Sequence, residues 1–129
     1  MTVKNAMRGS SAIGPVNALW IGGAMTTIAR LAVTSFQRCG HGVRLYAYDD
    51  IPNVARCVDL LDACEVLLRS ELERFAGNIV QFSDRFRWRL LMERGGYWVD
   101  TDLVCLRAFR FSQALVFGSG QTASRARRC

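Results

Sequence analysis

The first third of the chain combines short apolar runs with a segment of helical spacing. Residues 16–21 form an apolar run that ends in Gly22-Gly23, which is typical of a buried strand followed by a tight turn. In the next segment, apolar or small side chains recur at the spacing of one helical face, at Ile28, Leu31, Ala32, Ser35 and Phe36. We therefore predict a strand and then an amphipathic helix that buries these five positions.

The ends of this helix are marked by residues that favour helix boundaries. Thr26 or Thr27 can cap its start and Gly40 can end it, and the apolar residues 43–48 then predict a second strand. A strand, helix and strand in this order form a βαβ unit, which favours a mostly parallel sheet with helices on its faces. The predicted fold class is α/β with a Rossmann-like core.

Asp49-Asp50 falls at the carboxyl end of the second predicted strand. Open α/β sheets bind ligands at the carboxyl ends of their strands, so the pair is a candidate ligand site. The simpler interpretation, which we favour about two to one, is a solvated turn before Pro52.

The middle of the chain has a less definite pattern. Apolar residues are dense in residues 54–68, and they fit either one helical face or a short strand at 58–61 followed by a brief helix. Residues 69–78 are polar and predict a connection that turns at Gly77-Asn78.

The segment from residue 83 onward predicts a helix, a turn and a strand. Ser83 is a suitable N-cap for a helix that runs to about Arg94, and Gly95-Gly96 can end it. The strand should span Tyr97 to Leu106. From Ser112 onward the sequence has no apolar period.

Length and composition indicate one folded domain. The chain has 129 residues, 50% of them hydrophobic, and it carries a formal net charge of +6 with 17 basic and 11 acidic groups. Arginines 125, 127 and 128 lie in the last five residues, and the other basic residues are scattered between apolar positions. This distribution does not predict a nucleic-acid surface and supports at most weak attraction to phosphates or anionic lipid.

The five cysteines form no CxxC pair, so we expect neither a disulfide framework nor a zinc site. The stretch before Pro15 is too polar for a signal peptide, and no apolar run is long enough to span a membrane. We expect a cytoplasmic protein, with peripheral association at the inner face of the membrane as an open alternative.

Asp100-Thr101-Asp102 is the first candidate for chemistry. Seven aspartates in 129 residues give about 0.4 Asp-x-Asp triplets by chance, so the triplet alone means little. Side chains alternate in an extended strand, however, and Asp100 and Asp102 should therefore share one face with Trp98. Two adjacent carboxylates need a compensating cation, and their hard oxygens suit Mg²⁺ or Mn²⁺.

The preceding helix adds Asp84 and Arg87, which are three residues apart and should lie on one helical face. Taken alone, they predict an ion pair worth only about 0.2–0.5 kcal/mol. If the Gly95-Gly96 turn folds the strand back beside the helix, the pair can converge with Asp100 and Asp102 on one ligand.

These residues make a recognisable pattern. The order SD-x2-R-x3-L-x3-GG-x3-D-x-D, from Ser83 to Asp102, resembles the DXD sugar-binding region of GT-A glycosyltransferases. It is similar to a branch that includes capsular-polysaccharide enzymes, α-1,6-mannosyltransferases and α-1,4-galactosyltransferases. Leu19-Trp20-Ile21-Gly22-Gly23 resembles the first strand of the same family, and the likeness runs from about Val16 to Gly118.

The resemblance implies a role for each matching residue. Asp102 would bind Mn²⁺ or Mg²⁺, and Asp100 would contact the metal shell or the donor. Asp84 and Arg87 would hold the donor sugar and its phosphate side, while Trp20 would stack on the base unless it is a core aromatic. Trp98 stands where the family often has tyrosine.

The resemblance also implies a reaction. A sugar would move from a UDP- or GDP-sugar to a saccharide or lipid-linked acceptor, with retention at the anomeric carbon. No residue can be nominated as a nucleophile, and His41, the only histidine, is expected to be a turn residue between two glycines.

Two other functions stay open. A dinucleotide-binding oxidoreductase would use Gly22-Gly23 and the Asp49-Asp50 pair, although the chain lacks G-x-G-x-x-G. The other alternative is a non-catalytic remnant or nucleotide-binding module, because the resemblance ends at Gly118. We accordingly expect a partial donor-binding domain at residues 1–118, a divergent tail at 119–129, and an acceptor half lost by truncation or frameshift.

Overall fold

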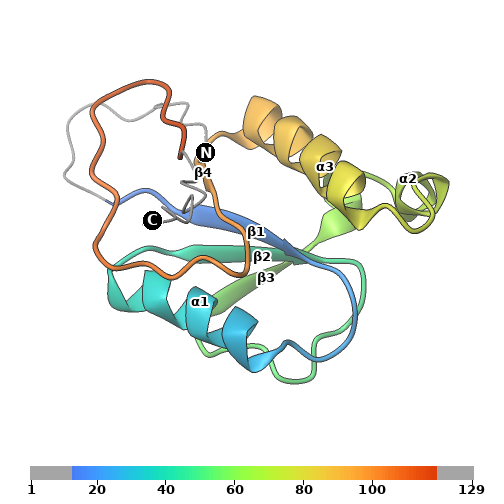
Figure 1. Ribbon diagram of the computed structural model, residues 1–129, viewed down its shortest axis with the longest axis horizontal. Helices are drawn as coiled ribbons and strands as arrows, with labels where there is room; N and C mark the ends of the chain where they lie inside the picture. The colour runs from blue at the N-terminus through green and yellow to red at the C-terminus, as the bar shows by residue number, and fades with distance from the viewer. Residues whose placement is uncertain (1–12, 119–129) are drawn as a thin grey trace, which may run out of the picture.

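A parallel four-stranded sheet with the order β3-β2-β1-β4 forms the centre of the molecule (Figure 1). The computed structural model describes residues 13–118. Its elements are β1 (Val16–Trp20), α1 (Thr27–Arg38), β2 (Val43–Ala47), β3 (Val58–Asp62), η1 (Ala63–Glu65), α2 (Arg69–Arg74), α3 (Ile79–Arg94) and β4 (Tyr97–Trp98). The predicted α/β class with a parallel sheet is confirmed.

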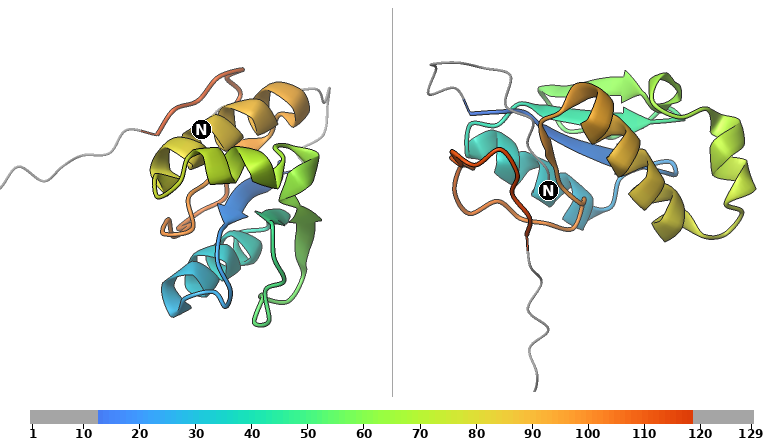
Figure 2. Two further views of the ribbon diagram at one scale, coloured as in Figure 1. Left: turned by 90° about the vertical axis from the view of Figure 1, so that its right-hand side faces the viewer. Right: turned by 90° about the horizontal axis from the view of Figure 1, so that it is seen from above.

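Helices cover both faces of the sheet (Figure 2). Alternate residues of β1 point to opposite sides, so Val16 and Ala18 pack in a core with α1, while Leu19 packs against a second core with α3. Phe36 fills the first core, and Phe82, Phe86 and Leu90 fill the second; all four are buried. The sheet is therefore the middle layer of three.

The β1–α1–β2 unit forms where the sequence predicts it. The Thr26 side chain caps α1 by accepting a hydrogen bond from the backbone N–H of Ala29 at 3.1 Å. The predicted buried face needs correction, however, because Ile28 and Leu31 are 63% and 58% exposed. The helix is rotated so that Ala29, Ala32, Val33 and Phe36 face the sheet.

The middle segment resolves the alternative that the sequence left open. Residues 58–62 form β3, which pairs in parallel with β2, and the short helix η1 follows it. The predicted polar connection over residues 69–78 is wrong in part, since α2 occupies its first six residues. The turn at its end is present, with Gly77 at a φ of 81°.

The helix α3 begins five residues before the predicted start. Asn78, not Ser83, caps it, and the Asn78 side chain accepts from the backbone N–H of Gln81 at 3.1 Å. The helix ends at Arg94, before Gly95, as the sequence predicts. The earlier start places one additional helical turn beside the carboxyl ends of the strands.

The strand β4 is much shorter than predicted. Only Tyr97 and Trp98 pair with β1, and the chain then turns at residues 101–102 instead of extending to Leu106. The preceding turn needs glycine, because a Cβ on Gly96, which has a φ of 86°, would lie 2.9 Å from Asn17 Nδ2. That buried amide nitrogen donates to the Tyr97 carbonyl at 3.0 Å and supports the short pairing.

Residues 119–129, predicted to be a divergent tail, lie outside the described residues. Among the helices of residues 13–118, none has both the length and the apolar character to cross a bilayer.

Candidate functional site

A cleft of about 420 Å³ opens at the carboxyl ends of β1 and β4, beside the first half of α3. We call it the carboxyl-end cleft. It is lined by Leu19, Trp20, Ile21, Ile79, Val80, Ser83, Asp84, Arg87, Trp98, Val99, Asp100, Thr101 and Asp102. All five residues that the sequence nominates, namely Trp20, Asp84, Arg87, Asp100 and Asp102, are in this set. The fold thus brings together residues up to 82 positions apart in the chain.

Trp20 reaches the cleft from the last position of β1. Its indole Nε1 donates to the Gly23 carbonyl at 3.0 Å, so the glycine turn holds the ring in place. The ring is half-buried and also packs against the core beneath α1. Trp20 is therefore a core contact, as one interpretation predicts, and it also forms a wall of the cleft, while its stacking on a base stays a prediction.

Asp84 and Arg87 lie one turn apart on α3 and form an ion pair, with 2.9 Å between Arg87 Nη2 and Asp84 Oδ1. The Asp84 side chain is 54% exposed and the Arg87 side chain 30% exposed, so water screens this pair and it adds little stability. The Arg87 guanidinium also lies over the ring of Trp88, at 5.8 Å from its centroid. These contacts orient a cation toward the cleft without burying it.

Asp100 and Asp102 follow β4 and lie in a turn, so the predicted strand geometry does not hold for them. Trp98 Nε1 donates to Asp100 Oδ1 at 3.1 Å, which keeps these two side chains on one side of the chain as expected. The backbone N–H of Leu103 closes the turn on the Asp100 carbonyl at 3.1 Å. Both carboxylates are exposed at the mouth of the cleft, and Asp102 follows Asp100 around the turn.

The apolar side of the cleft was not predicted. Ile79 and Val80, which are exposed at the start of α3, line it together with Leu19 and Ile21 at the end of β1. Their only signal in the sequence is a pair of apolar residues directly after the cap Asn78. The cleft consequently has one charged side and one apolar side, which suits a ligand with an anionic part and a flat or apolar part.

The donor set of the cleft is compatible with a hard divalent cation. Asp100 uses Oδ1 for Trp98, and its second carboxylate oxygen and both oxygens of Asp102 are not engaged by any residue of the described chain. Within residues 13–118 no cluster of three or more His, Cys, Asp or Glu side chains could hold a metal ion. Magnesium and manganese commonly bind one or two protein carboxylates and complete their shell with water and phosphate, so two aspartates fit such an ion when a phosphate ligand is present.

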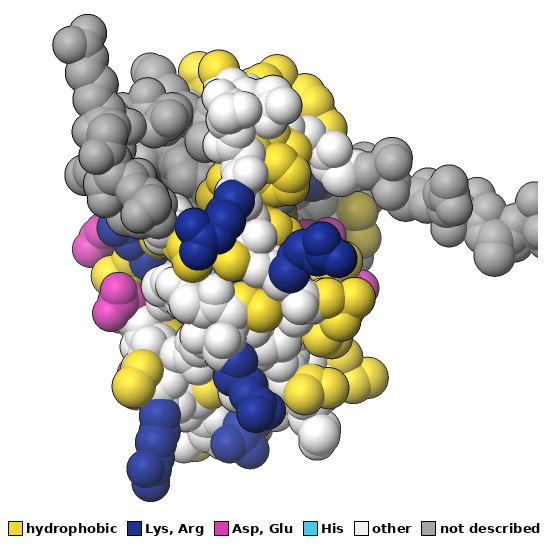
Figure 3. Space-filling view, turned by 90° about the vertical axis from the view of Figure 1, so that its left-hand side faces the viewer, with side chains coloured by type: hydrophobic (Ala, Val, Ile, Leu, Met, Phe, Trp, Pro, Cys, Tyr) yellow, Lys and Arg dark blue, Asp and Glu magenta, His cyan; other side chains and the backbone are white. Residues whose placement is uncertain are grey.

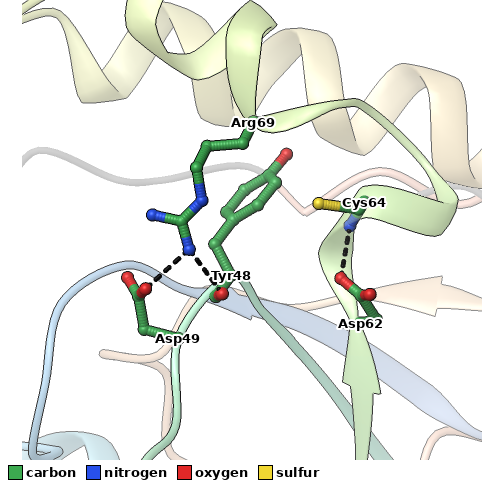
Figure 4. Close-up of polar contacts among 5 residues, drawn as sticks. All are labelled: Tyr48, Asp49, Asp62, Cys64 and Arg69. Atoms are coloured by element: carbon green, nitrogen blue, oxygen red, sulfur yellow. Dashed lines mark hydrogen bonds and ion pairs between the residues drawn. The ribbon is translucent and has the colours of Figure 1, made fainter.

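The other acidic pair predicted at a strand end has a different environment. Asp49 Oδ1 accepts a hydrogen bond from Arg69 Nη2 at 2.6 Å, and the same nitrogen donates to the Tyr48 carbonyl (Figure 4). The hydrogen bond to Asp49 raises the pKa of Arg69. Asp49 therefore ties the end of β2 to the start of α2, as the turn interpretation implies, and it does not line the carboxyl-end cleft.

Tyr48 adds a second connection between the end of β2 and the residues before α2. Its hydroxyl donates to the Leu67 carbonyl at 2.8 Å, and burial, followed by the nearby Cys64 thiol, raises the pKa of Tyr48 above its usual range. Asp62 caps η1 by accepting from the backbone N–H of Cys64 at 2.9 Å (Figure 4). Tyr48, Asp49, Asp62 and Arg69 each have a hydrogen-bond partner that joins neighbouring elements.

His41 directly follows the turn at residues 39–40, close to where the sequence predicts a turn, and its burial was not predicted. It is 3% exposed, and its ring contacts Phe36, Tyr97 and Phe109. Nε2 accepts from the backbone N–H of Phe109 at 2.9 Å, which leaves the proton on Nδ1 to bind the Gly14 carbonyl at 2.7 Å. His41 thus joins three segments at the amino ends of the strands and lies away from the cleft.

Comparison of the chain with family models, with curated proteins and with solved structures found no match. The geometry of the site and the sequence pattern carry the functional argument.

Proposed function

We propose that this chain carries the donor site of a metal-dependent, retaining GT-A glycosyltransferase, which moves a sugar from a UDP- or GDP-sugar to a saccharide or lipid-linked acceptor. The observation that supports it best is the convergence of Trp20, Asp84, Arg87, Asp100 and Asp102 on one cleft. The resemblance of two separate sequence segments to this family selects the same residues, and those segments meet only through the fold.

The chemistry of a glycosyl diphosphate explains why these residue types suit the cleft. Cleavage of the anomeric C–O bond leaves negative charge on the diphosphate and develops positive charge on the sugar carbon. Arg87 at the cleft wall is placed to bind a phosphate oxygen, because a guanidinium pairs with phosphate in two parallel hydrogen bonds. Asp84 would hold Arg87 in this orientation and accept hydrogen bonds from sugar hydroxyls.

Asp100 and Asp102 would hold a divalent cation together with the diphosphate. When bound there, Mg²⁺ or Mn²⁺ supplies charge stabilisation to the leaving diphosphate. Trp98 limits the freedom of Asp100 by donating to one of its oxygens, which leaves the other for the ligand. Trp20, Ile79 and Val80 line the cleft and form the surface against which the nucleoside would rest.

A metal-independent nucleotide-binding module is the second candidate. One observation favours it, since the Asp84 carboxylate is already paired with Arg87 and the cleft has a large apolar side. The oxidoreductase has less support, because Asp49, the acidic group it requires at the end of β2, is engaged by Arg69.

Calorimetric titration of the whole chain with UDP-glucose, GDP-mannose and NAD⁺, each with Mn²⁺ and with EDTA, tests the proposal. We expect one nucleotide sugar to bind with Mn²⁺ and at least about tenfold more weakly with EDTA. Equal binding with EDTA would favour the metal-independent module, and preferential binding of NAD⁺ would favour the oxidoreductase. The absence of binding to every nucleotide would contradict all three functions.

A further inference from the structure

The last part of the described chain has an unusual composition. No aspartate or glutamate follows Asp102, and residues 103–118 contain eight large apolar side chains and two arginines. Fourteen large apolar residues of the described chain are exposed, and six of them lie in this segment: Leu103, Val104, Leu106, Phe111, Leu115 and Phe117. The segment has no helix or strand in residues 103–118, so its exposed face does not result from amphipathic secondary structure.

Two inward contacts determine which side chains of the segment face outward. The backbone N–H of Cys105 donates to Ser35 Oγ at 2.8 Å, which attaches the segment to α1. Four residues later, Phe109 packs among the rings of Phe36, His41 and Tyr97. Between and around these anchors, Leu106 is 91% exposed and Phe117 is 62% exposed.

The neighbouring surface of α1 extends this apolar region. Leu31 and Ile28 lie one and two turns before Ser35 on the same side of the helix, and both are exposed. In Figure 1 the segment runs along α1 before it rises past the sheet. Figure 3 faces this end of the molecule, where basic side chains lie among apolar ones and acidic side chains appear only near the margins.

The charge of the segment is uncompensated. Arg107 and Arg110 are exposed, and within residues 13–118 neither has a carboxylate partner, as is also true of Arg30, Arg38, Arg44 and Arg56. What distinguishes the segment is that no acidic residue follows Asp102. Apolar side chains interspersed with arginines, without carboxylates, match the headgroup region of an anionic bilayer. A protein partner would explain the apolar residues, but it would not explain the absence of acidic ones over the whole segment.

We infer that this C-terminal surface, formed by Leu103, Val104, Leu106, Phe111, Leu115 and Phe117 with Arg107 and Arg110, docks on an anionic lipid bilayer. The apolar side chains insert at the level of the headgroups, and the arginines bind lipid phosphates. Deeper entry is excluded for this segment, because its backbone lacks the internal hydrogen bonds that the hydrocarbon region demands. The inference does not depend on the proposed function, since it uses none of the residues of the carboxyl-end cleft.

Co-sedimentation of the whole chain with vesicles tests this inference, using phosphatidylcholine alone and phosphatidylcholine mixed with phosphatidylglycerol. We expect binding to the anionic vesicles only. The double change Arg107→Gln and Arg110→Gln should weaken it by about fivefold for each arginine. Leu106→Ser with Phe117→Ser should weaken it by at least about tenfold.

Matched substitutions away from the C-terminal surface, at Leu68 directly before α2 and at Arg74 in α2, provide the control. Leu68 is 63% exposed and Arg74 is exposed, so Leu68→Ser and Arg74→Gln alter the same residue types elsewhere and should leave vesicle binding unchanged. Circular dichroism verifies that each variant is folded. Equal binding to both kinds of vesicle, no binding to either, or equal losses in the control variants would overturn the inference. So would a dimer in sedimentation velocity that the Leu106→Ser and Phe117→Ser pair abolishes, because it would assign the surface to a second copy of the chain.

Discussion

The two ends of the parallel sheet use polar side chains in different ways. At the amino ends of the strands, His41 is buried among Phe36, Tyr97 and Phe109, and both of its ring nitrogens are hydrogen-bonded. At the carboxyl ends, Asp100 and Asp102 are exposed at the mouth of a cleft and retain oxygens without partners in the described chain. The first arrangement stabilises the fold, whereas the second leaves charge available for a ligand.

This difference means that stability and ligand binding should respond to substitutions at different ends of the molecule. A buried group with both hydrogen bonds made contributes through packing and through the cost of leaving its partners unpaired. Exposed charges contribute little to stability because water screens them. A large loss of stability from a substitution in the carboxyl-end cleft, or a loss of ligand affinity alone from a substitution at the amino ends, would contradict this difference.

The largest effect on stability should come from His41→Ala. The change removes a buried ring and leaves the Gly14 carbonyl and the Phe109 N–H without their partner, so we expect a loss of about 2–4 kcal/mol in the free energy of unfolding. Urea denaturation followed by fluorescence measures it. Asp102→Asn is the matched comparison and should stay within about 0.5 kcal/mol of the original chain. Similar losses in the two variants would break the comparison.

Gly96→Ala should have the next largest effect, because Gly96 forms the turn that brings β4 and Asp100 back beside α3. A methyl group there would meet Asn17 Nδ2 at 2.9 Å, and the φ of 86° disfavours any side chain. We expect a loss of about 1–3 kcal/mol. Gly23→Ala is the control, since nothing lies within 4 Å of its added Cβ. Equal unfolding curves for both variants would argue against the close approach.

Arg87→Ala separates ligand affinity from stability most sharply. Its partner Asp84 is 54% exposed, so loss of the ion pair should change the free energy of unfolding by less than about 1 kcal/mol. Affinity for the nucleotide sugar with Mn²⁺ should fall by about tenfold or more if Arg87 binds phosphate. Arg85→Ala, on the same helix outside the cleft lining, should leave affinity unchanged. Equal affinities of the Arg87 and Arg85 variants would remove Arg87 from the site.

Cys105 should give a small effect at alkaline pH. Burial, together with the neighbouring Cys39 thiol, raises the pKa of Cys105 to about 11 from an ordinary value of 9.0. A raised acidic pKa means that the folded chain holds the proton more tightly, so this contribution to stability is complete below about pH 9 and is lost as the pH rises through about 11. Urea midpoints between pH 8 and 11 should decline less in Cys105→Ala than in the original chain, and an unchanged decline would contradict this assignment.

The sequence predicted those features that depend on local pattern. The β1–α1–β2 unit follows from apolar runs, a threonine cap and a glycine turn within 32 residues, and the end of α3 follows from Gly95. The start of α3 was wrong because Ile79 and Val80 are exposed, and no local rule distinguishes exposed from buried apolar residues.

Features that depend on distant partners were missed. His41 is bonded to residues 27 and 68 positions away, so neither contact is visible in the pattern around Gly40 and Gly42. The length of β4 is set by its pairing with Val16 and Asn17 of β1, which the period of residues 97–106 does not encode. Four of the five nominated cleft residues could be placed together because they lie within 19 residues of one another, whereas Trp20 was added by family resemblance.

The dependence of nucleotide-sugar affinity on Mn²⁺, measured for the original chain, Asp102→Asn and Asp50→Asn, tests the central claim most directly. Asp50 is an exposed aspartate outside the cleft lining, so its variant controls for the loss of one negative charge. We predict that Mn²⁺ strengthens binding of the nucleotide sugar by at least about tenfold in the original chain and in Asp50→Asn, and that Asp102→Asn loses this gain while keeping its stability. Equal gains in all three proteins would contradict the assignment of the carboxyl-end cleft as a metal-dependent donor site.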